Sequence, residues 1–222
     1  MDELASLDEQ QAQLAQRRGR IILEEAKGRL EEAGVGEVVM TLRNDDLIET
    51  TLEFEADADL IVIGKRGEAA DFAKLHLGSN LERVVRSSSK PVLVAARAFK
   101  PIKRFLVAFD GGTSATKAVY HIAHNAVFSG LEGQVLMVGS DTAEARSKLD
   151  KAVSMLKAGG LSVQADVVSG QADKVITSRV AEAGIDLLVM GAYGHSRIRS
   201  LIIGSTTTEM IRSCLIPVML FR

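Results

Sequence analysis

The stretch "DLLVMGAYGHSRIRSLIIGSTTTEM", Asp186 to Met210, decides the fold of this chain. An unbroken apolar run precedes two glycines three residues apart, Gly191 and Gly194, and a third glycine, Gly204, stands directly before four hydroxyl residues. An apolar run that ends in a glycine turn and leads into an amphipathic stretch is typical of a buried parallel strand followed by a helix. The stretch therefore predicts a strand, a turn and a helix of an α/β domain.

The same pattern occurs twice in the chain. Residues 56–96 match residues 183–221 in order and in kind, with one extra residue between the glycines of the first copy. The matched pairs are Asp59 with Asp186, Gly64 with Gly191, Gly67 with Gly194, Gly78 with Gly204, Ser79 with Ser205, Arg86 with Arg212, and Pro91 with Pro217. Each copy reads as strand, helix, strand, so the chain is predicted to be a tandem repeat.

The second half, residues 99–222, reads as a complete repeat. Apolar runs predict strands at 104–109, 134–138, 162–168, 186–190 and 217–221, with helices from about 114, over 143–160, over 172–184 and from about 201. Five strands that alternate with four helices predict a doubly wound, parallel five-stranded sheet of the Rossmann-like α/β class.

The first half, residues 1–98, reads as an incomplete repeat that lacks its first two strands. Residues 4–33 are predicted to form one long charged helix instead. The missing strands would leave strand edges unpaired and apolar helix faces uncovered. We therefore expect residues 1–98 to be stable only against the second half or a second chain, with the N-terminal helix as one candidate to cover the gap.

Composition indicates an ordinary globular protein. Apolar residues make up 46% and charged residues 25% of the 222, with a net charge of −2, which requires no nucleic-acid partner. The single cysteine, Cys214, cannot form an internal disulfide and is expected to be packed. No apolar run is long enough to span a bilayer, and the acidic N-terminus does not resemble a signal peptide. These features predict a cytoplasmic protein outside the membrane.

The glycine pattern lies where open α/β sheets bind ligands, at the carboxyl ends of the strands. Gly191 and Gly194 would let a phosphate approach the backbone, and Gly204, Ser205 and Thr206 would supply NH and hydroxyl donors from the start of a helix. The alternative is that the first two glycines only form a tight turn and that Ser205 is a helix N-cap. Neither the P-loop nor the G-x-G-x-x-G motif is present.

With this spacing, the chain resembles the universal stress protein family in tandem form. The signature G-x2-G-x9-G-[ST] stands as Gly191, Gly194, Gly204 and Ser205, and "LVAFDGGTSATKAV" resembles the first strand of the family, with its acidic residue at Asp110. The resemblance covers the second half from about residue 103 and most of the first half from about residue 21.

The resemblance implies a binding site for ATP, with or without Mg2+, in the second repeat. In ATP-binding members the first-strand carboxylate contacts ribose or adenine, which points to Asp110, and the end of the second strand frames adenine, which points to Val138. The glycine motif holds the phosphates, with His195 and Thr206 beside it. The alternative for Asp110 is a cap on the helix that opens near Thr113.

Other polar residues give weaker signals. His121 and His124 lie three apart on a predicted helix, but no third metal ligand accompanies them, so core or surface roles are favoured and no metal site is expected. Arg197 and Arg199 follow the glycine turn and either assist a phosphate or form a solvated edge.

The first repeat is not expected to hold a nucleotide by itself. Its glycines Gly64, Gly67 and Gly78 are present, but it has no strand with a counterpart of Asp110. Glu68 adds a negative charge where a phosphate would lie.

Three functions are compatible with these features. The first is an ATP-binding stress-response or signalling protein with little or no catalysis, and the second is a dimerisation scaffold of the same family that binds no nucleotide. A nucleotide-using enzyme is disfavoured because no base or nucleophile stands at convincing spacing. In the family the last strand often pairs across an interface, so residues 91–96 and 217–221 are the expected contact strands, within the chain or in a homodimer.

Replacing Gly194 with valine should block the approach of a phosphate and leave the fold intact, because the new side chain adds bulk only at the turn. Isothermal titration calorimetry with ATP measures the effect. Unchanged ATP affinity in this variant would show that the phosphate assignment is wrong.

Overall fold

The computed structural model describes residues 2–65, 79–192 and 204–222, which form two compact units, Met1–Asp46 and Leu47–Arg222. The first unit consists of helix α1 (Asp2–Glu32) and a following segment without regular secondary structure. The long helix predicted over 4–33 is therefore confirmed.

Helix α1 ends at a glycine in the left-handed region. Gly34 has a φ of 90°, and its amide donates to the Glu31 carbonyl at 3.0 Å. The amide of Val35 donates to the Leu30 carbonyl, also at 3.0 Å. This pair of bonds is the Schellman arrangement, which satisfies carbonyls that the helix leaves free at its end.

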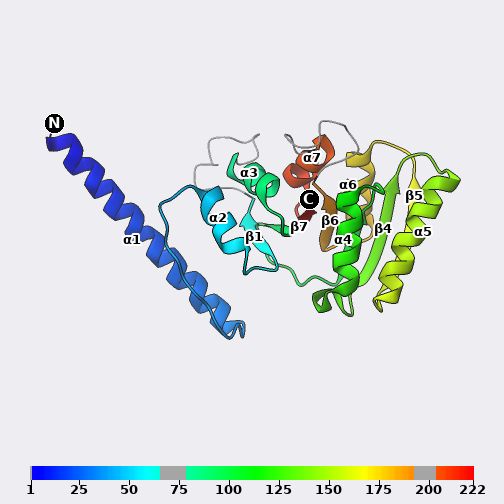
Figure 1. The fold of residues 1–222 in the computed structure, drawn as a ribbon, viewed down its shortest axis with the longest axis horizontal. Coiled ribbons are helices and arrows are strands. Elements are labelled where there is room, and N and C mark those ends of the chain that lie inside the picture. Colours follow the sequence, from blue (N-terminus) through cyan, green and yellow to red (C-terminus); the bar gives the residue numbers. More distant parts are fainter. Residues whose placement is uncertain (1, 66–78, 193–203) are drawn as a thin grey trace. The chain divides into compact units, whose positions relative to one another are not determined.

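The second unit is built on one mixed sheet with the strand order β1-β2-β7-β6-β3-β4-β5 (Figure 1). The strands are β1 (Ile61–Gly64), β2 (Val92–Ala95), β3 (Arg104–Ala108), β4 (Glu132–Val138), β5 (Ser162–Val168), β6 (Leu187–Gly191) and β7 (Val218–Phe221). Neighbouring strands are parallel except β2 and β7, which are antiparallel.

Helices cover both faces of this sheet (Figure 1). They are α2 (Leu47–Glu55), α3 (Ser79–Ser87), α4 (Thr113–His124), α5 (Ala143–Ala158), α6 (Ala172–Glu182) and α7 (Ser205–Ser213), with a short 3-10 turn η2 (Ala126–Phe128) after α4. One core cluster joins α4 and α5 to the sheet, and a second joins α3, α6 and α7 to the opposite face. There are two clusters because successive side chains of a strand point to opposite faces of the sheet. In β3, Phe105 belongs to the first cluster and Leu106 to the second.

The predicted fold class is confirmed. The five strands β3 to β7 and the helices α4 to α7 follow the order read from the second half of the sequence. The predicted start of the last helix, near Leu201, lies outside the described residues, and α7 is described from Ser205 onward. A five-stranded repeat without its first two strands would keep three, whereas within the described residues the first half contributes two strands, β1 and β2, to the sheet.

The last strands of the two repeats pair with each other inside the chain. Val92, Leu93 and Val94 of β2 lie opposite Leu220, Met219 and Val218 of β7, in that order. This is the within-chain form of the expected last-strand contact, and it joins both repeats in one sheet. The repeat boundary near residue 98 and a homodimer stay predictions.

The buried carboxylate of Glu55 fastens the end of α2 to the end of α3. It accepts hydrogen bonds from the Ser88 hydroxyl at 2.6 Å, the Ser89 amide at 3.0 Å and the Ser89 hydroxyl at 2.5 Å. Burial alone would raise the pKa of Glu55, but these hydrogen bonds to the charged form outweigh burial and lower the pKa. The turn before β2 is therefore held by charge-assisted bonds.

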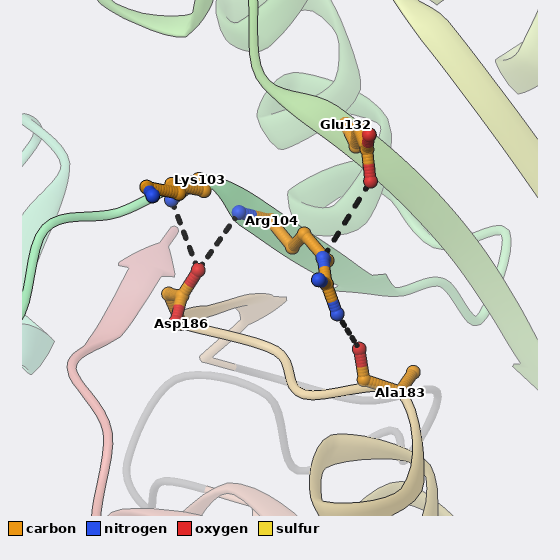
Figure 2. A network of polar contacts seen from close by, with 5 residues as sticks. All are labelled: Lys103, Arg104, Glu132, Ala183 and Asp186. Carbon is orange, nitrogen blue, oxygen red and sulfur yellow. Dashed lines mark hydrogen bonds and ion pairs between the residues drawn. The ribbon is translucent and has the colours of Figure 1, made fainter.

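A polar network ties the amino ends of the central strands together (Figure 2). One carboxylate oxygen of Asp186, just before β6, accepts from the backbone amides of Lys103 at 2.9 Å and Arg104 at 3.0 Å. The Arg104 guanidinium donates to the Ala183 carbonyl at 2.8 Å and lies 3.5 Å from a carboxylate oxygen of Glu132 on β4. Asp186 therefore aligns the start of β3 with β6.

Replacing Asp186 with alanine should lower the free energy of unfolding by about 1–3 kcal/mol, because two backbone amides lose a charged acceptor. Urea denaturation measures the change, with Asp150→Ala as the control, since Asp150 is an exposed acidic residue of α5. Equal stability of the two variants would contradict this role for Asp186.

Residues 1–98 alone should aggregate or remain molten and should not bind ATP, because β2 would lose its partner β7. Circular dichroism, thermal melting and calorimetry of this fragment measure the result. A soluble, cooperatively melting monomer that binds ATP would contradict both statements.

Candidate functional site

A cavity of about 300 Å³ opens at the carboxyl ends of β3, β4 and β6. It is lined by Ala108, Phe109, Asp110, Leu136, Val138, Ala172, Ile176, Met190, Gly191, Gly204, Ser205, Thr206 and Thr207. The chain runs from β3 through β4 to β5 on one side, then returns to place β6 on the other side of β3. Because strand order reverses at β3, the loops and helices diverge there and leave a crevice, as in other open α/β sheets.

Six of the eight site residues predicted from the sequence line this cavity: Asp110, Val138, Gly191, Gly204, Ser205 and Thr206. They come from four separate elements, and the sheet topology brings them together. The remaining two, Gly194 and His195, lie outside the described residues, as do Arg197 and Arg199.

Asp110 lies at the cavity mouth, two residues after β3, and it is exposed. Its Oδ1 accepts from the Gly112 amide at 2.8 Å, and Gly112 is the N-cap residue of α4. Gly111 between them has a φ of 74°, a conformation that favours glycine. The carboxylate therefore orders the turn that leads into α4, a role similar to the helix cap that the sequence offered as the alternative for Asp110. It also lines the cavity.

The inner wall of the cavity is apolar. Val138 at the end of β4 is half-buried, and Leu136, Ile176 and Met190 are buried. Such a wall suits the flat face of a ring more than a charged group, because burying a charge without a partner is costly.

Gly191 lines the cavity, and close packing against the start of α4 is a second reason for a glycine at this position. A Cβ at Gly191 would lie 3.0 Å from the Ser114 Cβ and 3.3 Å from the Ala115 amide nitrogen, so the glycine lets the start of α4 approach β6. Its carbonyl accepts from the buried Thr207 hydroxyl at 3.1 Å. Sequence reasoning missed Thr207, although it belongs to the hydroxyl run that follows Gly204.

The start of α7 corrects two sequence-based expectations. Gly204 is the N-cap residue, so the alternative that Ser205 is the N-cap is wrong. The Gly204 amide donates to the Ala192 carbonyl at 3.2 Å and is therefore not the donor that the sequence suggested. The first hydrogen bond of the α7 backbone runs from the Thr208 amide to the Gly204 carbonyl at 2.9 Å. The amides of residues 205–207 come before this bond, and the first amides of an α-helix have no partner within the helix.

Both candidate histidines are engaged in packing and hydrogen bonds. His121 packs against Phe221 with ring centroids 5.2 Å apart, and its Nε2 lies 3.2 Å from the side-chain nitrogen Nδ2 of Asn125. Burial lowers the pKa of His121 below its ordinary value, because this effect is larger than the opposing effect of the nearby Asp59 carboxylate. The His124 Nδ1 lies 2.8 Å from the Tyr120 carbonyl.

Cys214 is packed as predicted, with 6% of its surface exposed. Burial raises the pKa of its thiol above the ordinary value, because this effect is larger than the opposing effect of the positive charge of Lys65. Lys65, from the end of the first repeat's β1, donates to the Cys214 carbonyl at 2.8 Å and caps α7.

Within residues 2–65, 79–192 and 204–222, no group of three or more His, Cys, Asp or Glu side chains is placed to hold a metal ion. Of the helices described, none has the length and hydropathy to cross a bilayer.

The profile of the Universal stress protein family matches residues 1–96 and 134–222. The chain belongs to the universal stress protein family. The two matched segments correspond to its two repeats. Residues 97–133, which carry β3 and Asp110, lie outside the matched segments, so the assignment of Asp110 depends on the cavity and on the local sequence pattern.

Similar proteins carry the same family name. A universal stress protein of Synechocystis sp. is 36% identical over 224 residues, covering all of this chain and 78% of the relative. One from Methanocaldococcus jannaschii is 26% identical over 81 residues, covering 36% of this chain and 50% of the relative. The crystal structure of a universal stress protein from Archaeoglobus fulgidus DSM 4304 is 25% identical with a TM-score of 0.74, covering 93% of this chain and 77% of that one.

Proposed function

We propose that the second repeat of this universal stress protein binds an adenine nucleotide, with ATP as the implied ligand, in the cavity beside β3. The supporting observation is that six residues predicted from the sequence, on four separate elements, line this one cavity. Its volume of about 300 Å³ is at the lower end of the range for small-molecule sites.

The inner and outer parts of the cavity suit different parts of a nucleotide. In this proposal the apolar wall around Val138, Ile176 and Met190 receives the adenine ring. The exposed Asp110 carboxylate accepts hydrogen bonds from ribose hydroxyls, because an ionised carboxylate can only accept.

The start of α7 suits the phosphates. Gly204 has no side chain to cap the helix. The positive end of the helix dipole and the early amides of α7 can therefore bind an anion. Ser205 is exposed and Thr206 half-buried, and both hydroxyls are donors of the kind that phosphate oxygens accept. Whether Mg2+ accompanies the nucleotide is part of the test.

The proposed role is a cytoplasmic stress-response or signalling protein in which nucleotide occupancy alters assembly or partner choice, with little or no hydrolysis. The second candidate is a scaffold that binds no nucleotide. One observation favours it: Gly191 has a packing role at α4, so this glycine does not require a ligand.

Replacing Asp110 with alanine should weaken ATP binding at least tenfold, because charge-assisted hydrogen bonds contribute about 1.5–3 kcal/mol each. Calorimetry with and without Mg2+ measures the affinity, and Asp150→Ala is the matched control. Thermal melting checks that loss of the Gly112 hydrogen bond has not unfolded the variant.

Nucleotide recovered from the denatured, purified protein would support binding directly. Native protein that carries no nucleotide and gives no calorimetric signal with ATP would contradict the proposal and favour the scaffold.

A further inference from the structure

A second hollow of about 300 Å³ lies where the two repeats meet, and it shares no lining residue with the cavity beside β3. Its walls come from the turn before β2, from α4 between Lys117 and its carboxyl end, and from the end of β7. We propose that this hollow binds a phosphorylated small molecule.

Positive charge converges on this hollow from three elements. Lys90 precedes β2, Lys117 lies on α4 and Arg222 follows β7. Two negative groups offset part of this charge: the Glu55 carboxylate, which acts on Lys90, and the Asp59 carboxylate, which acts on His121. The remaining excess is positive, as a phosphate requires.

The cations are available to a ligand. Lys117 is exposed and Lys90 half-buried, and neither forms an ion pair within 4.0 Å of another described residue. The Arg222 guanidinium donates to the Ser87 carbonyl at 3.4 Å, a long hydrogen bond that leaves its other donors for an anion.

The backbone that carries Lys90 is held in place before any ligand arrives. The Ser88 hydroxyl accepts from the Lys90 amide at 3.0 Å and donates to the buried Glu55 carboxylate at 2.6 Å. A site whose backbone is already fixed loses less entropy on binding.

An aromatic wall suggests that the ligand carries a ring beside its phosphate. The rings of Tyr120 and His124 stack with centroids 4.1 Å apart and an angle of 27°, and Tyr120 is 58% exposed. Phe221 also lines the hollow. Aromatic faces attract further rings by offset stacking.

Phenyl phosphate is the probe, because it combines one phosphate with one ring. Its affinity is read from the NMR ring signals of His121 and His124, which line the hollow. The test variant is Lys90→Gln/Lys117→Gln, and the matched control is Lys151→Gln/Lys157→Gln, which removes two exposed lysines of α5 that do not line the hollow. All proteins are full-length, and thermal melting confirms their folds.

We expect saturable shifts of both histidine rings at millimolar phenyl phosphate, about tenfold weaker binding in the test variant, and no change in the control. Higher salt should weaken binding to the native protein, because the site acts through charge. Absence of saturable shifts, equal affinity in the two double variants, or shifts confined to the amides of residues 204–207 would each overturn the proposal. The outcome is independent of ATP binding, because the two hollows have separate walls.

Discussion

Burial of β3 in the interior of the sheet, between β6 and β4, is the constraint on which the rest of this structure depends. Phe105, Leu106 and Val107 are fully buried, with helices on both faces and β4 and β6 on the two edges. A strand in this position must be apolar on both faces, and its backbone must be paired on both sides. Its carboxyl end then opens between two diverging neighbours, which places Asp110 at the mouth of a cavity.

The antiparallel pairing of β2 with β7 makes the incomplete first repeat part of the same fold. It extends the sheet by two strands and adds α3 to the core cluster that contains α7. Lys65 adds a polar link, because it caps the carboxyl end of the helix whose amino end lines the proposed nucleotide site. The short repeat therefore supports the element that the complete repeat uses for phosphate binding in our proposal.

Helix α4 lies between the two proposed sites and contributes to both environments. Its N-cap is fixed by the Asp110 carboxylate, and its first turn packs against Gly191 beside the cavity. Its second half presents Tyr120 and His124 to the hollow at the repeat junction. The charges differ accordingly: an exposed carboxylate and a helix amino end at one site, and lysine and arginine side chains at the other.

The sequence by itself determined the elements of the second half and their order, because apolar runs, glycine turns and amphipathic stretches are local patterns. It also identified six residues that meet in one cavity, since the doubly wound order brings strand ends together. Only the tertiary structure decided what depends on distant contacts: that Gly191 makes room for α4, that the Gly204 amide is already bonded, and that Thr207 supports the cavity floor. The sequence could not indicate the hollow at the repeat junction, because its walls are far apart in the chain and meet only when β2 pairs with β7.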